Sequence, residues 1–113
     1  MALEQSLNHK GATFAAGYHR VREVRIRNYL NGPEVLVTLD SYADVAARNS
    51  NQDGNVLASA SFTVRNGADP LKDPQDLRDY FKASVTGRPY DVPMAQAYAY
   101  IKARGGYAAA RDV

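Results

Sequence analysis

Oxygen-bearing side chains suited to a metal ion gather in residues 49–55, which read NSNQDGN. Asn49, Asn51 and Asp53 occupy alternate positions and Gly54 follows them, as in the first half of an EF-hand calcium loop. The twelfth position of such a loop needs a bidentate Glu, whereas this chain has Ala60 there. The sequence therefore favours a loop that uses Asn, Asp and Gly for their turn geometry, with calcium binding as the weaker alternative.

Nucleophilic catalysis needs a nucleophile, a base and a group that orients the base. The chain has no Cys and no G-x-S-x-G elbow, and its two histidines, His9 and His19, have no patterned companions. Neither of the glycine-rich phosphate-binding patterns occurs. We therefore predict that the chain is not an enzyme and uses no cofactor, and we interpret His19 as a packed or surface residue.

Two strands are predicted within residues 18–42, joined by a type I′ turn at Asn31-Gly32, a dipeptide that tolerates positive φ. Strict alternation fails in the first strand, because its aliphatic residues then fall on opposite faces. One extra residue near Arg22-Glu23, a β-bulge, restores the phase. The bulge turns three aliphatic side chains inward together, namely Val21, Val24 and Ile26.

The same register places three basic side chains on the outer face: Arg20, Arg25 and Arg27. Basic residues beside aromatic ones on a sheet often hold single-stranded nucleic acid. However, 14 basic and 12 acidic residues leave a net charge of only +2, and Glu23 and Glu34 are interleaved with the arginines. We expect ion pairs on a solvated face, with single-strand binding as the less favoured alternative.

The remaining elements follow from periodicity and capping. Strands are predicted over residues 34–42 and 56–65, with Leu36 and Tyr42 covered by the last helix or by another chain. We expect a helical turn at 43–48 and a short helix with Asp73 as N-cap, while residues 80–86 fit a helix or a strand. The final helix opens at Pro93 and ends before Gly105-Gly106. Its inner stripe is Met94, Ala97, Tyr98 and Ile101, and Gln96, Tyr100 and Lys102 are expected on or near its outer side.

A chain of 113 residues without Cys is expected to form one domain that needs no disulfide. No apolar run is long enough for a membrane span and no secretory signal is present, so we expect a soluble, unprocessed protein. The predicted class is α+β: a small antiparallel β-sheet or sandwich of about three to five strands with the C-terminal helix packed on it. Residues 1–16 are predicted to be an extended N-terminal arm, with a frayed terminus as the equal alternative. Residues 17–113 are predicted to be the domain, which folds without the arm.

Three stretches resemble small structural proteins of tailed bacteriophages. They are Y-H-R-V-x-x-V-R-I from Tyr18, V-L-V-T-L-D-S-Y from Val35, and A-Y-A-Y-I-K followed by Y-A-A-A-R-D-V at the C-terminus. The likeness covers about two thirds of the chain, and residues 69–90 look like an insertion. Its motifs are structural and carry no catalytic residues.

The resemblance implies a virion component made in the host cytoplasm, which binds other virion proteins and copies of itself. The tail, baseplate or neck is the expected place, with capsid decoration as the alternative. A tyrosine-rich surface and a hairpin that is apolar on both faces fit a protein that works by being bound. We expect contacts on the arm, on one hairpin face and on the C-terminal tail, through Leu3, Leu7, Phe14, Leu36, Tyr42 and Tyr107.

Overall fold

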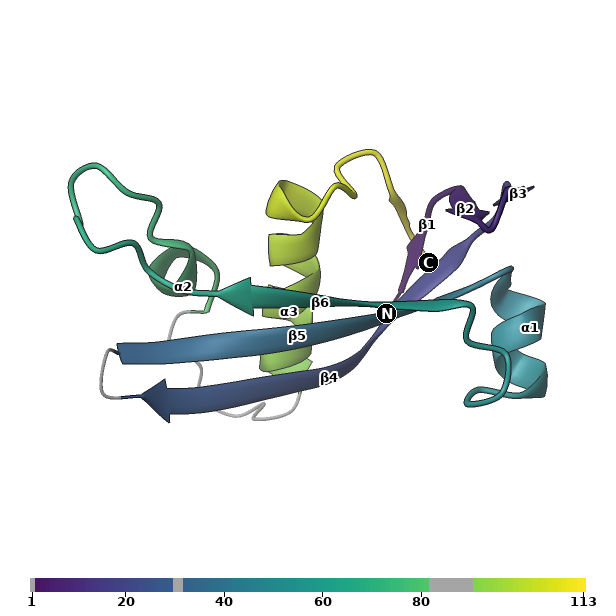
Figure 1. Cartoon of the computed structure of the whole chain (residues 1–113), viewed down its shortest axis with the longest axis horizontal. Coiled ribbons are helices and arrows are strands. Elements are labelled where there is room, and N and C mark those ends of the chain that lie inside the picture. The colour runs from purple at the N-terminus through teal and green to yellow at the C-terminus, as the bar shows by residue number, and fades with distance from the viewer. Residues whose placement is uncertain (1, 30–31, 82–90) are drawn as a thin grey trace.

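The computed structural model describes residues 2–29, 32–81 and 91–113, which form an α+β domain, as expected (Figure 1). The elements are, in chain order, β1 (Leu3–Glu4), β2 (Leu7–His9), β3 (Ala12–Phe14), β4 (Tyr18–Tyr29), β5 (Gly32–Tyr42), α1 (Val45–Ser50), β6 (Ala58–Val64), α2 (Asp76–Tyr80), α3 (Asp91–Arg104) and β7 (Arg111–Asp112). No helix in these ranges is long and apolar enough to cross a membrane.

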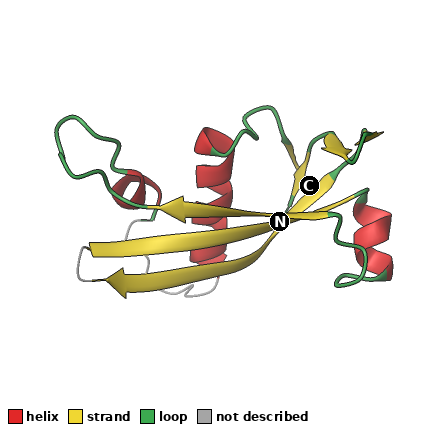
Figure 2. Ribbon diagram, in the orientation of Figure 1, coloured by secondary structure: helices red, strands yellow, loops and turns green. Residues whose placement is uncertain are grey.

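Five strands form one antiparallel sheet in the order β6-β5-β4-β1-β7, and β2 pairs with β3 in a separate hairpin. The long strands β4, β5 and β6 lie side by side, and α3 crosses one face of them (Figure 2). The short strands β1 and β7 come from the two ends of the chain. One edge of the sheet is therefore formed by two segments that are far apart in sequence.

The predicted bulge in β4 is confirmed. Val21 pairs with Leu39, and the next pair is Glu23 with Thr38, so Arg22 is the extra residue. Val21 is buried and Val24 is half-buried against the core. Ile26 shares their face but is 67% exposed, because β1 pairs with β4 only at its first two residues and, within the described residues, no strand flanks Ile26 on that side.

The core lies between the sheet and α3, and the predicted inner stripe of the helix is confirmed. Ala97 and Ile101 are fully buried, Tyr98 is nearly so, and Met94 packs against them. Their partners on the strands are aliphatic and also buried: Leu3, Val21, Val35, Val37, Leu39 and Val64.

The prediction of an arm at residues 1–16 is wrong for its first part. Leu3 is fully buried and pairs with His19 on one side and Asp112 on the other. The backbone of Ala2 exchanges two hydrogen bonds with that of Val113, at 3.1 and 3.0 Å. A two-residue strand is too short to show a period, which is why the sequence pattern missed it.

Residues 7–14 form the β2–β3 hairpin at the periphery of the domain (Figure 1). Lys10 and Gly11 connect its strands, with φ of +48° and +81°. Two successive left-handed residues make a type I′ turn, the hairpin turn that favours Asn-Gly. The Lys at the first of these positions is therefore strained relative to Asn.

Other boundaries differ from the predictions. Gly32 belongs to β5, and the turn predicted at Asn31-Gly32 falls partly on residues 30–31, outside the described residues. α3 begins at Asp91, two residues before Pro93. Of the ambiguous segment 80–86, Tyr80 ends α2, and residues 82–86 lie outside the described part.

Two side chains at the helices also lie elsewhere than the sequence predicted. Asp73 is not the N-cap of α2, because its carboxylate accepts the backbone N–H of Asp69 and Gln75 precedes the helix instead. Tyr100 does not point to the outer side of α3. Its ring lies between the rings of Phe62 and Tyr80, at 6.5 and 5.7 Å, because the loop that leads to α2 brings an aromatic cluster against α3.

Candidate protein interface

His19 joins three distant segments in the interior. Its Nε2 lies 2.9 Å from the carbonyl oxygen of Gln5, so this nitrogen carries the proton and donates it. Nδ1 then accepts the hydroxyl of Ser41 at 2.7 Å, and the ring of Tyr107 packs edge-on at 4.9 Å. Burial lowers the pKa of His19, although the hydrogen bond to Gln5 opposes that shift.

The Ser41–His19 contact has the spacing of a nucleophile and its base, but it lies in the core. His19 is 1% and Ser41 5% exposed. Both side chains are covered by the protein's own atoms. The pair is therefore a structural junction, which agrees with the interpretation of His19 as a packed residue.

The predicted arginine stripe is largely neutralised. Arg25 lies 2.7 Å from the carboxylate of Glu23, and Arg27 lies 3.6 Å from that of Glu34. Arg65, which directly follows β6, meets the same Glu34 at 2.8 Å, so Glu34 links β4, β5 and the end of β6 on the sheet face opposite α3, here called the open face. The expected ion pairs are thus present, although Glu23 and Arg25 belong to one strand.

Arg20 stands apart from that network and lines a small pocket beside the bulge. The neighbouring Arg22 reaches the buried carboxylate of Asp40 at 2.8 Å, and Ser59 donates to the same carboxylate at 2.6 Å. The structure therefore does not bring Arg20, Arg25 and Arg27 together as a free cationic surface.

The expected contact residues fall into two groups. Leu3 and Tyr42 are buried in the domain itself, and the Tyr42 hydroxyl donates to the carbonyl of Gln52, so the chain's own loop covers it. Tyr107 is half-buried, and its ring packs against the ring of His19. The second group is half-buried on the surface of the domain. It consists of Leu7 and Phe14, which pair with each other, and Leu36 on the open face.

The Asn-rich loop uses its side chains locally. Asn51 Oδ1 accepts the N–H of Gly54 at 2.9 Å, and the Asn55 amide donates to the carbonyl of Ala47 at 2.8 Å. Within the described residues, no three His, Cys, Asp or Glu side chains converge as metal ligands. These contacts fit the turn interpretation of residues 49–55.

The outer edge of β6 is open. β6 pairs with β5 over seven consecutive residues without a bulge, and no backbone hydrogen bond within the described residues joins its other edge. It reads ASASFTV, with neither charge nor Pro, and Ser59, Ala60, Ser61 and Thr63 are exposed. Edge strands usually carry charges, Pro or bulges that prevent pairing with another chain, and β6 carries none of these.

The loop of residues 66–75, between β6 and α2, is closed at its base by a β-bridge between Asn66 and Gln75. The Gln75 side chain is buried inside the loop, where its amide donates to the carbonyls of Gly67 and Asp73 at 3.2 and 3.3 Å. The loop therefore has an ordered interior of its own.

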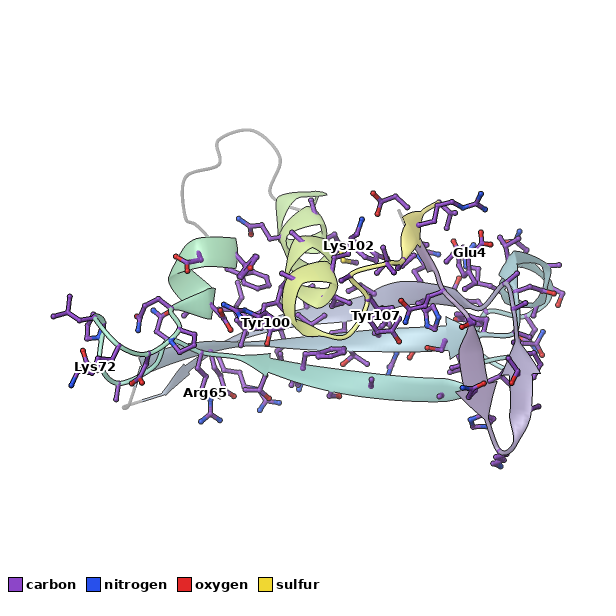
Figure 3. The ribbon with its side chains drawn as sticks, turned by 90° about the horizontal axis from the view of Figure 1, so that it is seen from above. Glu4, Arg65, Lys72, Tyr100, Lys102 and Tyr107 are labelled. Atoms are coloured by element: carbon purple, nitrogen blue, oxygen red, sulfur yellow. The ribbon has the colours of Figure 1, made fainter. Side chains whose placement is uncertain are left out.

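Leu71 lies at the tip of this loop and is 95% exposed. Asp69 fixes its position, because one carboxylate oxygen accepts the Leu71 N–H at 2.9 Å. The neighbouring acid, Asp73, is turned inward onto the N–H of Asp69. The tip therefore presents an apolar side chain and the adjacent Lys72 to solvent (Figure 3).

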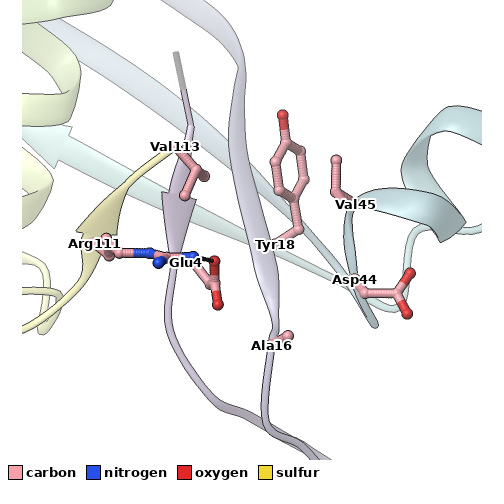
Figure 4. Close-up of a pocket in the computed structure, with 7 residues that line it drawn as sticks. All are labelled: Glu4, Ala16, Tyr18, Asp44, Val45, Arg111 and Val113. Atoms are coloured by element: carbon pink, nitrogen blue, oxygen red, sulfur yellow. Dashed lines mark hydrogen bonds and ion pairs between the residues drawn. The ribbon is translucent and has the colours of Figure 1, made fainter.

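A pocket of about 330 Å³ lies near the opposite end of the domain, between β1, β4, β7 and the start of α1 (Figure 4). Its apolar lining includes Tyr18, Val45 and Val113, the last two being 51% and 47% exposed. The Glu4–Arg111 ion pair borders one side. Asp44 lies at the other side, where its Oδ1 caps α1 by accepting the N–H of Ala47 at 2.7 Å.

No family model matches the chain, and neither curated proteins nor solved structures include a match.

Three surface features were not predicted from the sequence: the β6 edge, Leu71 and the pocket. A Leu between Pro70 and Lys72 inside a polar loop is a local signal for an exposed apolar residue. The pocket has no such signal, because Tyr18, Val45 and Val113 come from three separate parts of the chain.

Proposed function

We propose that this chain is a structural component of a tailed-phage virion, placed in the tail, baseplate or neck, which acts through contacts with other protein chains. The sequence resemblance supports the virion assignment. The residues that carry it lie mainly in β4, β5 and α3, the elements that build the core.

The observation that carries the protein-binding part is the open edge of β6. A neighbouring chain can add a strand there, because the seven residues of β6 are uncharged, run without a bulge and make no backbone hydrogen bond on their outer edge within the described residues. Main-chain hydrogen bonds would give affinity, and the small side chains of Ala58, Ser59 and Ala60 leave room for those of the partner. We expect the partner strand to come from another virion protein.

The ion pairs on the open face weigh against single-strand binding. Arg25 and Arg27 already have carboxylate partners, so a nucleic-acid phosphate would have to displace them. Binding that releases counterions needs cations that are free to meet phosphate.

The test is incorporation into particles. A phage that lacks this gene is complemented with wild-type chain or with the double variant Ser61→Lys, Thr63→Lys, and purified particles are probed for the chain. Both side chains are exposed, so the variant should fold, whereas two ammonium groups on the strand should prevent pairing. We expect wild-type chain in the particle and the variant outside it.

The matched control adds the same charges to exposed positions of α3, through Ala99→Lys and Ala103→Lys. It should be incorporated like wild type. Absence of the wild-type chain from purified particles would reject the virion assignment. Incorporation of the β6 variant at the wild-type level would show that the edge is not the contact.

A further inference from the structure

Two exposed apolar features of the described residues, Leu71 and the pocket, lie toward opposite ends of the longest dimension of the domain, which is 42 Å (Figure 3). Lys72, next to Leu71, marks one end, and Glu4, beside the pocket, lies toward the other (Figure 3). Leu71 therefore cannot reach the pocket of its own chain. A projecting side chain at one end and a hollow at the other suit a contact between two copies.

We propose that Leu71 of one copy inserts into the pocket between Tyr18, Val45 and Val113 of a second copy, so that copies join head to tail. This inference rests on the proposed function, because it names one of the partners, the chain itself.

The chemistry of the two surfaces is complementary. Leu71 offers an isolated aliphatic side chain on a loop that is already ordered, so little conformational entropy is lost when it docks. The pocket offers an aromatic ring and two half-exposed valines, which would lose contact with water when Leu71 enters.

Charge complementarity favours a second copy as the occupant. Lys72 is exposed beside Leu71, and Asp44 is exposed at the rim of the pocket. One Asp44 oxygen caps α1, which leaves the second oxygen available to an incoming ammonium group. At the other side of the pocket, Arg111 already pairs with Glu4, so it does not repel Lys72 as a free cation would.

A head-to-tail contact uses two different surfaces, and each copy keeps one of each free. Association therefore continues beyond a dimer, to a ring if the rotation between copies closes and to a filament if it does not. A two-fold dimer would instead use one surface on both copies and would stop at two.

The test uses two variants of the full chain, each of which removes one surface. Leu71→Ser removes the projecting side chain, and Val45→Arg fills the pocket and places a cation beside Lys72 of the partner. Both positions are exposed, so the urea unfolding midpoints should stay near wild type. Sedimentation velocity over a range of concentrations gives the association state.

We expect wild-type chain to associate beyond the dimer as its concentration rises, and each variant alone to remain monomeric, with its dissociation constant raised at least about tenfold. An equimolar mixture of the two variants should form a dimer and nothing larger, because it holds one intact Leu71 and one intact pocket. Asp44→Asn, which keeps the helix cap, should weaken wild-type association about two- to fivefold.

The proposed head-to-tail contact would be overturned if the equimolar mixture of the two variants stayed monomeric. It would also be overturned if the Leu71→Ser chain associated like wild type. A Leu71→Ser chain that associates normally but is lost from particles would overturn it as well, because Leu71 would then contact a different virion protein. The proposed function is judged separately, by the presence of wild-type chain in particles. It survives if the chain is incorporated but does not self-associate.

Discussion

The hydroxyl of Tyr98 accepts a hydrogen bond from the backbone N–H of Val21 at 2.8 Å, directly before the bulge in β4. At this point β4 has turned away from β1, whose pairing ends at His19. A side chain of α3 therefore satisfies a strand donor that no strand in the described part of the chain reaches, and it fixes the helix on the sheet at the bulge.

Tyr98→Phe should lower the free energy of unfolding by about 1–3 kcal/mol, because a buried backbone N–H loses its acceptor. Urea denaturation followed by circular dichroism measures the change. Tyr100→Phe is the matched control, since the ring of Tyr100 makes the aromatic contacts of that residue, and it should change the free energy by less. Equal effects of the two substitutions would contradict a special role for the Tyr98 hydroxyl.

Stability should fall on mild acidification because of His19. Its pKa in the folded protein is lowered from the unfolded value of 6.5, so the unfolded state binds the additional proton first as the pH drops. The contribution of neutral, buried His19 to the free energy of unfolding is fully present above pH 6.5. It decreases as the pH falls from 6.5 toward the pKa of His19 in the folded protein, and it does not change further below that pKa. Urea midpoints measured at intervals between pH 7.5 and 5 should show this slope.

His19→Gln, which keeps a donor and an acceptor, should remove that part of the pH dependence while lowering stability at neutral pH. His9→Gln changes a half-exposed residue of β2 and should keep the slope. The interpretation of His19 fails if its replacement leaves the pH profile unchanged.

Lys10→Asn should raise the free energy of unfolding by about 0.5–1 kcal/mol, because Asn tolerates the left-handed backbone of a type I′ turn better than Lys does. Thermal unfolding detects the gain as a higher Tm. Lys10→Ala also removes the Lys side chain but keeps the unfavourable φ, so it should give no gain. A Tm raised equally by both changes would point to the Lys charge instead.

Leu3→Ala should lower the free energy of unfolding by about 2–5 kcal/mol, the usual result of emptying a buried Leu site. Leu7→Ala, in the peripheral hairpin, should lower it by less, because Leu7 is half-buried. Urea denaturation compares the two. If Leu3→Ala proves the milder change, residues 2–4 would be the dispensable arm expected from sequence.

The central hairpin could be predicted because its side chains conflict with simple alternation. Val21, Val24 and the arginines fit a two-sided strand only with an extra residue at Arg22, where the structure has it. The inner face of α3 was equally readable from the spacing of its apolar residues. Leu3 was not, because its burial depends on pairing with His19 and Asp112, which no local pattern encodes.

The candidate interface was less predictable than the fold. Tyr42 was expected to be covered, and it is, but by the chain's own loop through Gln52 rather than by a helix or another chain. The β6 strand was expected, but its position as an edge follows from the strand order. The pocket beside Val45 and Val113 could not be predicted from the sequence, because its lining residues come together only once the order of all the strands is known.

The junction at His19 has a consequence for local unfolding. It ties Gln5 and Tyr107 to Ser41, and β1 lies between β4 and β7, so neither chain end can detach without breaking contacts of the other. Amide protons of residues 2–5 and 107–113 should therefore exchange with deuterium as one cooperative unit, at a lower opening free energy than the protons shared by β4 and β5.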